Sequence, residues 1–378
     1  MAKGDIFSSE VRERRDPETG LAFRQLTDGP DDSHHLYFTN PGWYDEGRRL
    51  LFVSTRNGAT DLFGMDVERG AFKQLTDECR VTDELLFTCL NPARPEAYFW
   101  RNGSLVALDL ETLDERILYE TPEGYANNIL TVTCDGALVC TGIYEDLQNR
   151  FDVDLLKGYV GFEEYWAAKP RSAIISVDTI SGEVRELFSE EYWVGHVSAS
   201  PTVPHILTYC HEGPWDKVDN RIWGLDLRDG RTWPIYPRKG EESVGHEYWM
   251  QDGVTVGFHG TEKDGPAFIG TVRYDDTGLE LFPFPRHFTH IHSNDLKLAT
   301  GDGTNWDPML YVWTLESGQE AKPVPVLRHG CSASVQARHV HPRFNPDSSR
   351  IVFVSDDTGI GNIYDVSVAD IRAAGLLE

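Results

Sequence analysis

The sequence predicts an all-β protein, a seven-bladed β-propeller that is closed by an N-terminal strand completing the last blade. Three observations lead to this prediction. A strand phrase recurs seven times, its copies are spaced at about the length of a four-stranded blade, and each end of the chain has a strand pattern that lacks a neighbour in sequence. With 378 residues the chain is long for one globular core, whereas a repeat architecture grows without deepening its core.

The recurring phrase is an apolar strand, followed by a short turn rich in Gly, Asp or Thr and then a second strand. The last residues of successive copies lie 43, 69, 48, 46, 42 and 53 residues apart. Another apolar strand precedes each copy, as at Arg49–Ser54 and Arg350–Ser355, and Asn345-Pro-Asp is one of the turns before these strands. The seven copies are Leu62–Asp66, Leu105–Asp109, Ile174–Asp178, Ile222–Asp226, Phe268–Val272, Leu310–Thr314 and Ile363–Ser367.

The two ends of the chain are expected to meet in one blade. Ala22–Thr27 has the pattern of a strand with no upstream partner, and the last copy ends near Arg372 with no strand after it. Pairing them removes two exposed strand edges. We therefore expect residues 1–378 to form a single propeller domain, with residues 1–21 as an N-terminal extension.

The longest interval between copies contains an insertion, residues 146–169. Its aromatic and acidic part, Tyr159–Trp166, predicts a short helix or a lid over one mouth of the propeller channel. The alternative is a capping loop that only packs against the blades.

Charge and cysteine content limit the possible partners. Lys plus Arg number 35 against 61 for Asp plus Glu, a net charge of −26, which argues against nucleic acid and anionic membranes as partners. An acidic substrate would then need local positive charge, from a metal ion or from arginines, because screening limits the global field. The N-terminal residues have no apolar core and no 18-residue apolar run exists, so we expect a cytoplasmic protein. The cysteines have no Cys-x-x-Cys pair, which favours reduced thiols; they are Cys79, Cys89, Cys134, Cys140, Cys210 and Cys331.

One short motif, Gln336-Ala-Arg-His339-Val-His341-Pro342, has the residue types of a metal site. On an extended strand, histidines at i and i+2 share a face, about 7 Å apart at their Cα atoms, so both imidazoles reach one ion. Gln336 would add a neutral oxygen, but a regular strand places it on the other face, so we expect a turn or bulge between Gln336 and His339. Neutral ligands leave the cation's charge uncompensated, which suits an anionic substrate. A His-x-His pair alone also occurs without a metal.

Four other stretches carry clustered polar residues. We expect them on the innermost strands of the blades and their loops, which face the central channel of a propeller. They are Trp193–His196, Cys210–Pro214 with Asp219–Arg221, Ser243–Glu247 and Thr289–Asn294.

Six motifs follow one another in order: Cys210-His-Glu-Gly-Pro214, Val218-Asp-Asn-Arg221-Ile-Trp, His246-Glu-Tyr-Trp249, His290 before Ser293-Asn294, Gly301-Asp-Gly303 and Gln336-x-x-His339-x-His341-Pro342. Together with a rhythm of strands and turns typical of TolB-like propellers, this combination resembles the oligogalacturonate lyase family of bacterial pectin degradation. The resemblance extends from about Arg24 to Asp365, nearly the whole chain. It implies a seven-bladed propeller, Mn²⁺ or another divalent transition metal in the channel, and β-elimination on short galacturonides.

The resemblance also implies roles for individual residues. His292 and Arg338 depart from the family's pattern, and these extra basic groups would contact one more carboxylate or shift the preference to another uronide. The implied residues are the metal ligands His290, Gln336, His339 and His341, the base His246 with the active-site residue Arg221, and the substrate-binding cleft residues His196 and His211. To these we add His292 and Arg338, the two departures from the pattern, as expected substrate-binding residues.

The chemistry of these residue types agrees with elimination. The C5 proton of a uronate is acidic only if the adjacent carboxylate is neutralised and the developing enolate is stabilised, which a divalent cation does. A histidine is a suitable acceptor for that proton near neutral pH, and Arg221 could pair with a carboxylate through two hydrogen bonds.

We therefore expect a lyase for di- and trisaccharides that releases 4-deoxy-5-keto-uronate products. The expected partner is a small acidic oligosaccharide. The sequence leaves the oligomeric state open, a homo-oligomer included. The alternatives are a lyase for a different uronide oligomer, or a non-enzymatic TolB-like propeller that binds a partner protein.

Overall fold

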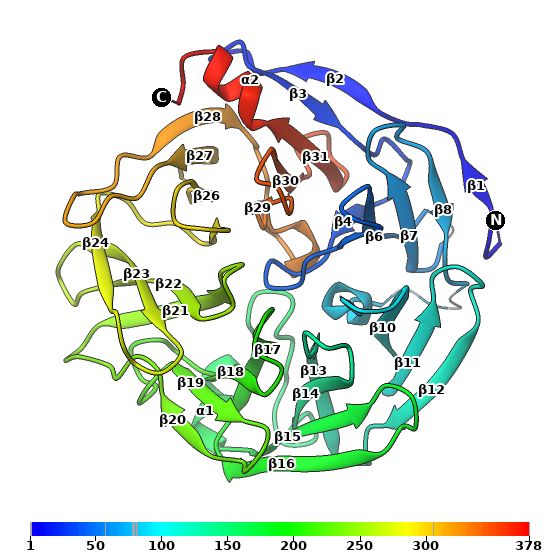
Figure 1. The fold of residues 1–378 in the computed structure, drawn as a ribbon, viewed down its shortest axis with the longest axis vertical. Helices are drawn as coiled ribbons and strands as arrows, with labels where there is room; N and C mark the ends of the chain where they lie inside the picture. Colours follow the sequence, from blue (N-terminus) through cyan, green and yellow to red (C-terminus); the bar gives the residue numbers. More distant parts are fainter. Residues whose placement is uncertain (1, 57, 78–79, 81, 305, 378) are drawn as a thin grey trace. The chain divides into compact units, whose positions relative to one another are not determined.

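The computed structural model describes residues 2–56, 58–77, 80, 82–304 and 306–377. The chain forms two compact units, the first made of Met1–Leu86 and Phe282–Glu378 and the second of Phe87–Leu281. Strands of the described residues form seven antiparallel sheets, the blades of the predicted seven-bladed β-propeller (Figure 1). The all-β prediction is therefore confirmed.

The first unit contains three sheets, with the strand orders β1-β8-β7-β6-β4, β2-β3-β31-β30-β29 and β25-β26-β27-β28; β5 also pairs with β6. Its elements are β1 Ile6–Phe7, β2 Arg12–Arg15, β3 Ala22–Gln25, β4 Ser33–His35, β5 Trp43–Tyr44, β6 Arg49–Ser54, β7 Asp61–Asp66, β8 Phe72–Gln74, β25 Ile291–Ser293, β26 Ala299–Gly301, β27 Met309–Trp313, β28 Val324–Arg328, η2 Gln336–Arg338, β29 Arg343–Phe344, β30 Arg350–Ser355, β31 Asn362–Ser367 and α2 Val368–Ala373.

The second unit contains the sheets β12-β11-β10-β9, β13-β14-β15-β16, β17-β18-β19-β20 and β21-β22-β23-β24. Two elements cross the residue boundaries of the units, η1 Glu84–Phe87 and β24 Glu280–Phe284. The others are β9 Cys89–Leu90, β10 Glu96–Arg101, β11 Ser104–Asp109, β12 Glu115–Glu120, β13 Tyr125–Val132, β14 Leu138–Glu145, α1 Phe162–Ala168, β15 Arg171–Asp178, β16 Val184–Glu191, β17 Val194–Ala199, β18 Ile206–His211, β19 Ile222–Asp226, β20 Thr232–Pro234, β21 Ser243–Trp249, β22 Thr255–Thr261 and β23 Ala267–Arg273.

All seven copies of the recurring phrase are strands, and each is the third strand of its blade. They are β7, β11, β15, β19, β23, β27 and β31. The middle strands are continuous apolar runs because both faces of a blade are covered. In β10, for example, Tyr98 and Trp100 are fully buried and join a cluster with Leu130 and Ile175 of the neighbouring blade.

The N-terminal strand pairs with the last strand of the chain, as predicted. β3 lies beside β31 (Figure 1). Arg24 pairs with Asp365, and Gln25 pairs with Tyr364. The fully buried carboxylate of Asp365 accepts hydrogen bonds from Arg24 and from Arg350, both on strands of the same blade. The charge-assisted contact with Arg24 joins residues from opposite ends of the sequence.

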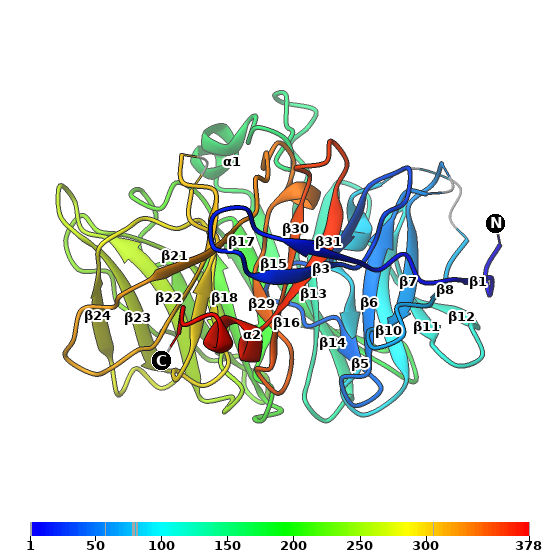
Figure 2. The same ribbon diagram turned by 90° about the horizontal axis from the view of Figure 1, so that it is seen from above.

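The insertion contains the expected helix, α1, which lies beyond the strand ends of its unit (Figure 2). Its Tyr165 is buried; the hydroxyl group donates to the carbonyl oxygen of Glu145 (2.7 Å) and accepts from the backbone N–H of Leu147 (3.0 Å). Trp166 lies so close to Gly213 that a Cβ atom there would be 2.2 Å from the indole Cδ1. The helix therefore packs on the motif Cys210–Pro214, while its function as a lid stays a prediction.

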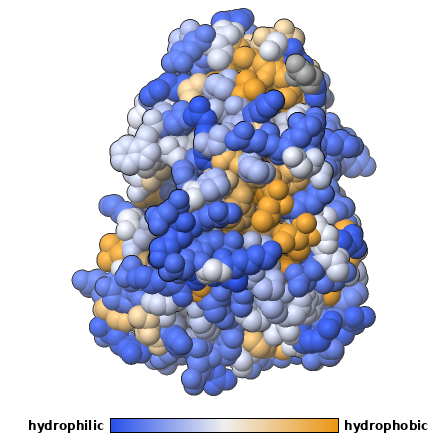
Figure 3. Space-filling view, turned by 90° about the vertical axis from the view of Figure 1, so that its left-hand side faces the viewer, coloured by the Kyte–Doolittle hydropathy of each residue, from blue (hydrophilic) through white to orange (hydrophobic). Residues whose placement is uncertain are grey.

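The surface, the helices and the cysteines of the described residues give information about the environment of the protein. The face in Figure 3 is mainly hydrophilic, in keeping with the net charge of −26. No helix in the part of the chain that the structure describes is long and apolar enough to cross a membrane. Cys79 lies outside the described residues. The other cysteines are free thiols, as predicted: Cys89, Cys134, Cys140, Cys210 and Cys331.

Candidate metal centre and active site

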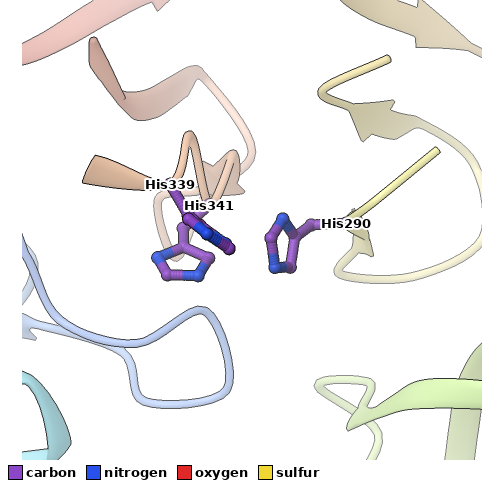
Figure 4. Close-up of side chains that lie close together, drawn as sticks. All are labelled: His290, His339 and His341. Carbon is purple, nitrogen blue, oxygen red and sulfur yellow. The ribbon is translucent and has the colours of Figure 1, made fainter. Parts of the chain in front are cut away.

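Three buried histidines of the first unit converge on one point (Figure 4). His290 directly precedes β25, and His339 and His341 lie in the loop between η2 and β29. The ring centroids are 4.4 Å apart for His290 and His341, 5.5 Å for His339 and His341, and 5.6 Å for His290 and His339. One nitrogen atom of each ring lies within 4.8 Å of the other two, a spacing that a single ion with bonds of about 2 Å can bridge.

The backbone that presents these rings differs from the predicted strand. His339 is extended, with φ −72° and ψ 148°, but His341 has a φ of 43°, in the left-handed region that is unfavourable for a residue with a side chain. The expectation of a regular His-x-His strand was therefore wrong. The turn expected between Gln336 and His339 is present, because Gln336 begins η2 and its carbonyl oxygen accepts from the N–H of His339. The Oε1 atom of Gln336 is buried, and its role as a ligand stays a prediction.

Asp302 fixes the orientation of His290. Its carboxylate accepts a hydrogen bond from Nδ1 of His290 (2.7 Å) and another from the backbone N–H of the same residue (2.8 Å). Burial opposes ionisation of Asp302, but the adjacent His290 outweighs it and lowers the pKa of the carboxyl group. With Nδ1–H committed to this contact, the lone pair of the His290 ring is on Nε2, as in the carboxylate–histidine pairs that support metal ligands.

The triad fits a transition-metal ion. Burial, helped by the neighbouring His290, lowers the pKa of His339 to about 4, so this ring is neutral near pH 7. Its Nδ1 atom is buried and has no hydrogen-bond partner among the described residues. A buried imidazole lone pair without a donor is costly unless a ligand satisfies it. A pocket adjoins this point, lined by residues that include Thr289, His290, Asp302, His329 and His339.

Two other predicted residues of this unit already have protein partners. Arg338 donates to both carboxylate oxygens of Asp32, at 3.1 and 2.8 Å. His292 is 1% exposed, and its Nδ1 accepts from the backbone N–H of Phe344. Burial, followed by the charge of Arg343, lowers the pKa of His292 well below its ordinary value.

In the second unit, Arg221 is at the centre of a buried ionic cluster. Its guanidinium group is 2% exposed and donates to Glu212 Oε1 (2.8 Å) and to Glu247 Oε2 (3.2 Å). His196 lies between the same two carboxylates, with ring nitrogens 3.5 Å from Glu212 and 3.6 Å from Glu247. Although His196, Cys210 and Glu212 have metal-ligand spacing, we assign no metal to them, because Glu212 is already paired with Arg221.

His246 projects from an irregular point of β21. The register of β21 against β22 shifts between Gly245 and Tyr248, and His246 has a φ of 50°. Trp215 packs its ring edge against His246 at a centroid distance of 4.9 Å, and a Cβ atom on Gly245 would lie 2.3 Å from the indole. Glycine at 245 and the bulge therefore allow Trp215 to lie against the histidine.

His211 is held differently. Its Nδ1 lies 2.6 Å from Asp219 and its Nε2 lies 2.9 Å from Glu190, while the ring stacks on Tyr192 at a centroid distance of 4.0 Å. Burial opposes the charged ring, but the two carboxylates outweigh it and raise the pKa of His211. Both nitrogens can donate to these carboxylates only in the imidazolium form, so the two contacts favour the charged ring and fix its orientation.

Sequence reasoning missed several of these residues. Asp302 lies within the motif Gly301-Asp-Gly303, but nothing in the motif shows which histidine it contacts. Trp215 follows the motif Cys210–Pro214 directly, and His259 is the polar residue in the middle of β22, between Val-Gly-Phe and Gly. A histidine or carboxylate that interrupts a buried strand is the signal that could have indicated such partners.

The fold and the triad define the class: a β-propeller with a buried three-histidine site of the kind that holds a transition-metal ion. Residues 1–371 match the profile of the family described as oligogalacturonate lyase. The chain belongs to the oligogalacturonate lyase family, which confirms the resemblance and makes it a lyase.

Individual relatives agree along nearly the whole chain. The oligogalacturonide lyase of Pectobacterium atrosepticum is 28% identical over 399 aligned positions, covering 98% of this chain and 99% of the relative. The oligogalacturonate lyase of Dickeya dadantii is 27% identical over 398 positions, with the same coverage. A solved oligogalacturonate lyase in complex with manganese is 26% identical, with a TM-score of 0.87 over 97% of this chain and 98% of that chain. An oligogalacturonate lyase structure from Vibrio parahaemolyticus has a TM-score of 0.85 at 26% identity and covers 97% and 99% of the two chains.

Proposed function

We propose that this protein is a metal-dependent lyase that cleaves oligogalacturonide di- and trisaccharides by β-elimination, releasing 4-deoxy-5-keto-uronate products. The observation that carries the proposal is the buried triad His290, His339 and His341, supported by Asp302, in a chain of the oligogalacturonate lyase family. The names of both curated relatives support the same substrate class.

The proposed metal ligands are His290, His339, His341 and Gln336, holding Mn²⁺ or another divalent transition metal. A solved relative described as a manganese complex supports this choice, and imidazole suits such ions. A divalent cation neutralises a uronate carboxylate and stabilises the charge that develops when C5 loses its proton. The imidazole and carboxamide ligands bring no negative charge of their own, so the site favours an anionic sugar in a chain whose net charge is −26.

We assign the proton transfer from C5 to His246, whose ring has one nitrogen against His259 and is packed by Trp215. We also assign Arg221 as a catalytic residue beside His246. Its guanidinium group lies 5.9 Å from the Trp215 ring, and it pairs with Glu247, which follows His246 in β21, and with Glu212, which follows β18. Neither residue has to form a covalent bond to the sugar, because β-elimination needs no nucleophile.

Substrate contacts by His196, His211, His292 and Arg338 stay predictions. His211 and Arg338 are cationic but are already paired with carboxylates, so they would contact a uronate only in competition with those partners. A cytoplasmic location is also proposed, supported by the free thiols.

The test measures the ultraviolet absorbance of the new double bond conjugated to the carboxylate. Metal-stripped protein is mixed with digalacturonate, with and without added Mn²⁺, and other uronide dimers are tested in parallel. We expect a rise that depends on Mn²⁺ and on digalacturonate and that is lost in His246→Ala. The rise should persist in the control variant His205→Ala, because this partly buried histidine directly precedes β18 and is not among the proposed site residues. A rise with another uronide alone would assign that uronide as the substrate in place of digalacturonate. The absence of a rise with any uronide, despite bound metal, would overturn the proposal.

A further inference from the structure

A second histidine, His259, is in direct contact with His246. Nδ1 of His246, on β21, lies 3.3 Å from Nε2 of His259, on β22, and the ring centroids are 5.4 Å apart. His259 is 8% exposed, whereas His246 is only partly buried. The pair therefore has an inner ring, His259, and a more accessible outer ring, His246.

One proton lies between the two facing nitrogens, and its position decides what His246 can do. If His246 donates from Nδ1, the neutral ring has its lone pair on Nε2 and can accept a proton there. If His259 donates instead, the neutral His246 ring carries its proton on Nε2 and cannot act as a base at that atom. Only the first arrangement is compatible with proton abstraction.

The packing around the pair limits other orientations. Trp215 contacts both rings edge-on, at 4.9 Å from His246 and 5.6 Å from His259. The φ of 50° at His246 and the bulge in β21 set the direction from which the ring enters the site. Packing against Trp215 and the backbone conformation at His246 therefore fix the contact between the two histidines.

The partner is an imidazole and not a carboxylate, which affects the strength of the base. Another titratable neighbour is His196 of β17, whose ring stacks at 6.4 Å from that of His246 and which contacts Glu212 and Glu247. A neutral acceptor behind a histidine stabilises its protonated form less than a carboxylate does. The contact with His259 therefore sets which nitrogen of His246 carries the proton, and it adds no carboxylate charge of its own.

We propose that His259 is a positioning residue for the elimination: it accepts the Nδ1–H of His246 and so presents Nε2 of His246 as the proton acceptor. This inference rests on the proposed function, because it assigns His246 as the base.

The experiment compares His259→Phe, which keeps a ring without an acceptor, with His259→Gln, which keeps an acceptor oxygen near the former Nε2. In His259→Phe we expect kcat to fall on the order of 10- to 100-fold with KM within about threefold, and the acidic limb of the kcat/KM profile to shift. His259→Gln should recover most of the lost kcat, and His205→Phe should behave as wild type. Equal losses in the Phe and Gln variants, with unchanged pH profiles, would overturn the proposal.

A second readout does not need activity. In protein labelled with ¹⁵N-histidine, the imidazole signals of His246, identified by their loss in His246→Ala, report which nitrogen carries the proton. We expect the Nδ1–H form in the wild type and a mixture in His259→Phe. An Nε2–H form in the wild type would overturn the inference even if elimination occurs. If the wild-type protein eliminates no uronide, the proposed function fails, and this spectrum still decides separately whether His259 accepts the Nδ1–H of His246.

Discussion

Replacing Asp302 with asparagine is expected to weaken metal binding about 10- to 100-fold without unfolding the protein. The Asp302 carboxylate is buried and accepts from Nδ1 of His290 (2.7 Å), from the His290 backbone N–H (2.8 Å) and from the backbone N–H of Thr289 (3.1 Å). Asparagine has nearly the same shape, so the change is mainly one of charge and of hydrogen-bond direction.

The size of the effect follows from these contacts. In the Asp302→Asn variant, the amide oxygen can keep the two backbone hydrogen bonds, but the new NH₂ group then faces the Nδ1–H of His290, donor against donor. A buried hydrogen bond to a charged group contributes about 1.5 to 3 kcal/mol. Since about 1.4 kcal/mol is a factor of ten in affinity, the dissociation constant should rise about 10- to 100-fold.

Isothermal titration of Mn²⁺ into the metal-free protein measures this constant directly. The matched control is Asp307→Asn in the same loop, where the carboxylate binds Arg286 (2.5 Å) and the hydroxyl group of Tyr311 (2.6 Å). We expect wild-type affinity for the control. If Asp302→Asn also binds Mn²⁺ with wild-type affinity while circular dichroism shows an intact fold, the argument that Asp302 orients a metal ligand is refuted.

Two further predictions concern the second unit. Arg221→Met leaves two buried glutamates without their cation, so the free energy of unfolding in urea should fall by about 3 to 5 kcal/mol, and a loss below about 1 kcal/mol would contradict this account. His211 has a raised pKa in the folded state, so its stabilisation is fully present below the ordinary value of about 6.5 and is lost as the pH rises through the folded-state pKa. The difference in Tm between wild type and His211→Gln should therefore be largest near pH 6 and shrink at higher pH, and a constant difference would count against a charged, anchored ring.

The propeller was predictable because its signal is local and repeated. Each third strand is a short apolar run that ends in a turn, and seven such runs at blade spacing identify the architecture without knowledge of any contact. The pairing of β3 with β31 followed from a physical requirement, because an unmatched edge at each end of the chain is satisfied by joining the two.

The geometry of the site was not predictable in the same way. His196, His246 and His341 all have positive φ values, 48°, 50° and 43°, which an extended-strand prediction does not contain. A backbone of this kind is maintained by surrounding packing, and no local sequence preference selects it. The turn at η2 was expected only because Gln336 had to reach the same side as the two following histidines.

The sequence also did not predict the hydrogen-bond partners of these histidines, because the partners come from other segments of the blade. Asp302 reaches His290 across a distance of 12 residues, and His259 reaches His246 across 13. The second contact links β21 with β22, and the first links the residue before β25 with the residue after β26. The number of residues between two such partners depends on the length of the hairpin. A difference of one residue in that length turns a side chain to the other face, and the sequence does not predict the length this accurately.

Three histidines with different partners illustrate how one residue type is given separate tasks. His211 lies between two carboxylates and is held as a cation. His290 has one carboxylate on Nδ1, which leaves Nε2 as a lone-pair donor for a metal. His246 faces another imidazole, that of His259, on that atom. The proposed function assigns the proton transfer to His246, and we infer that the contact with His259 decides which of its nitrogens accepts the proton.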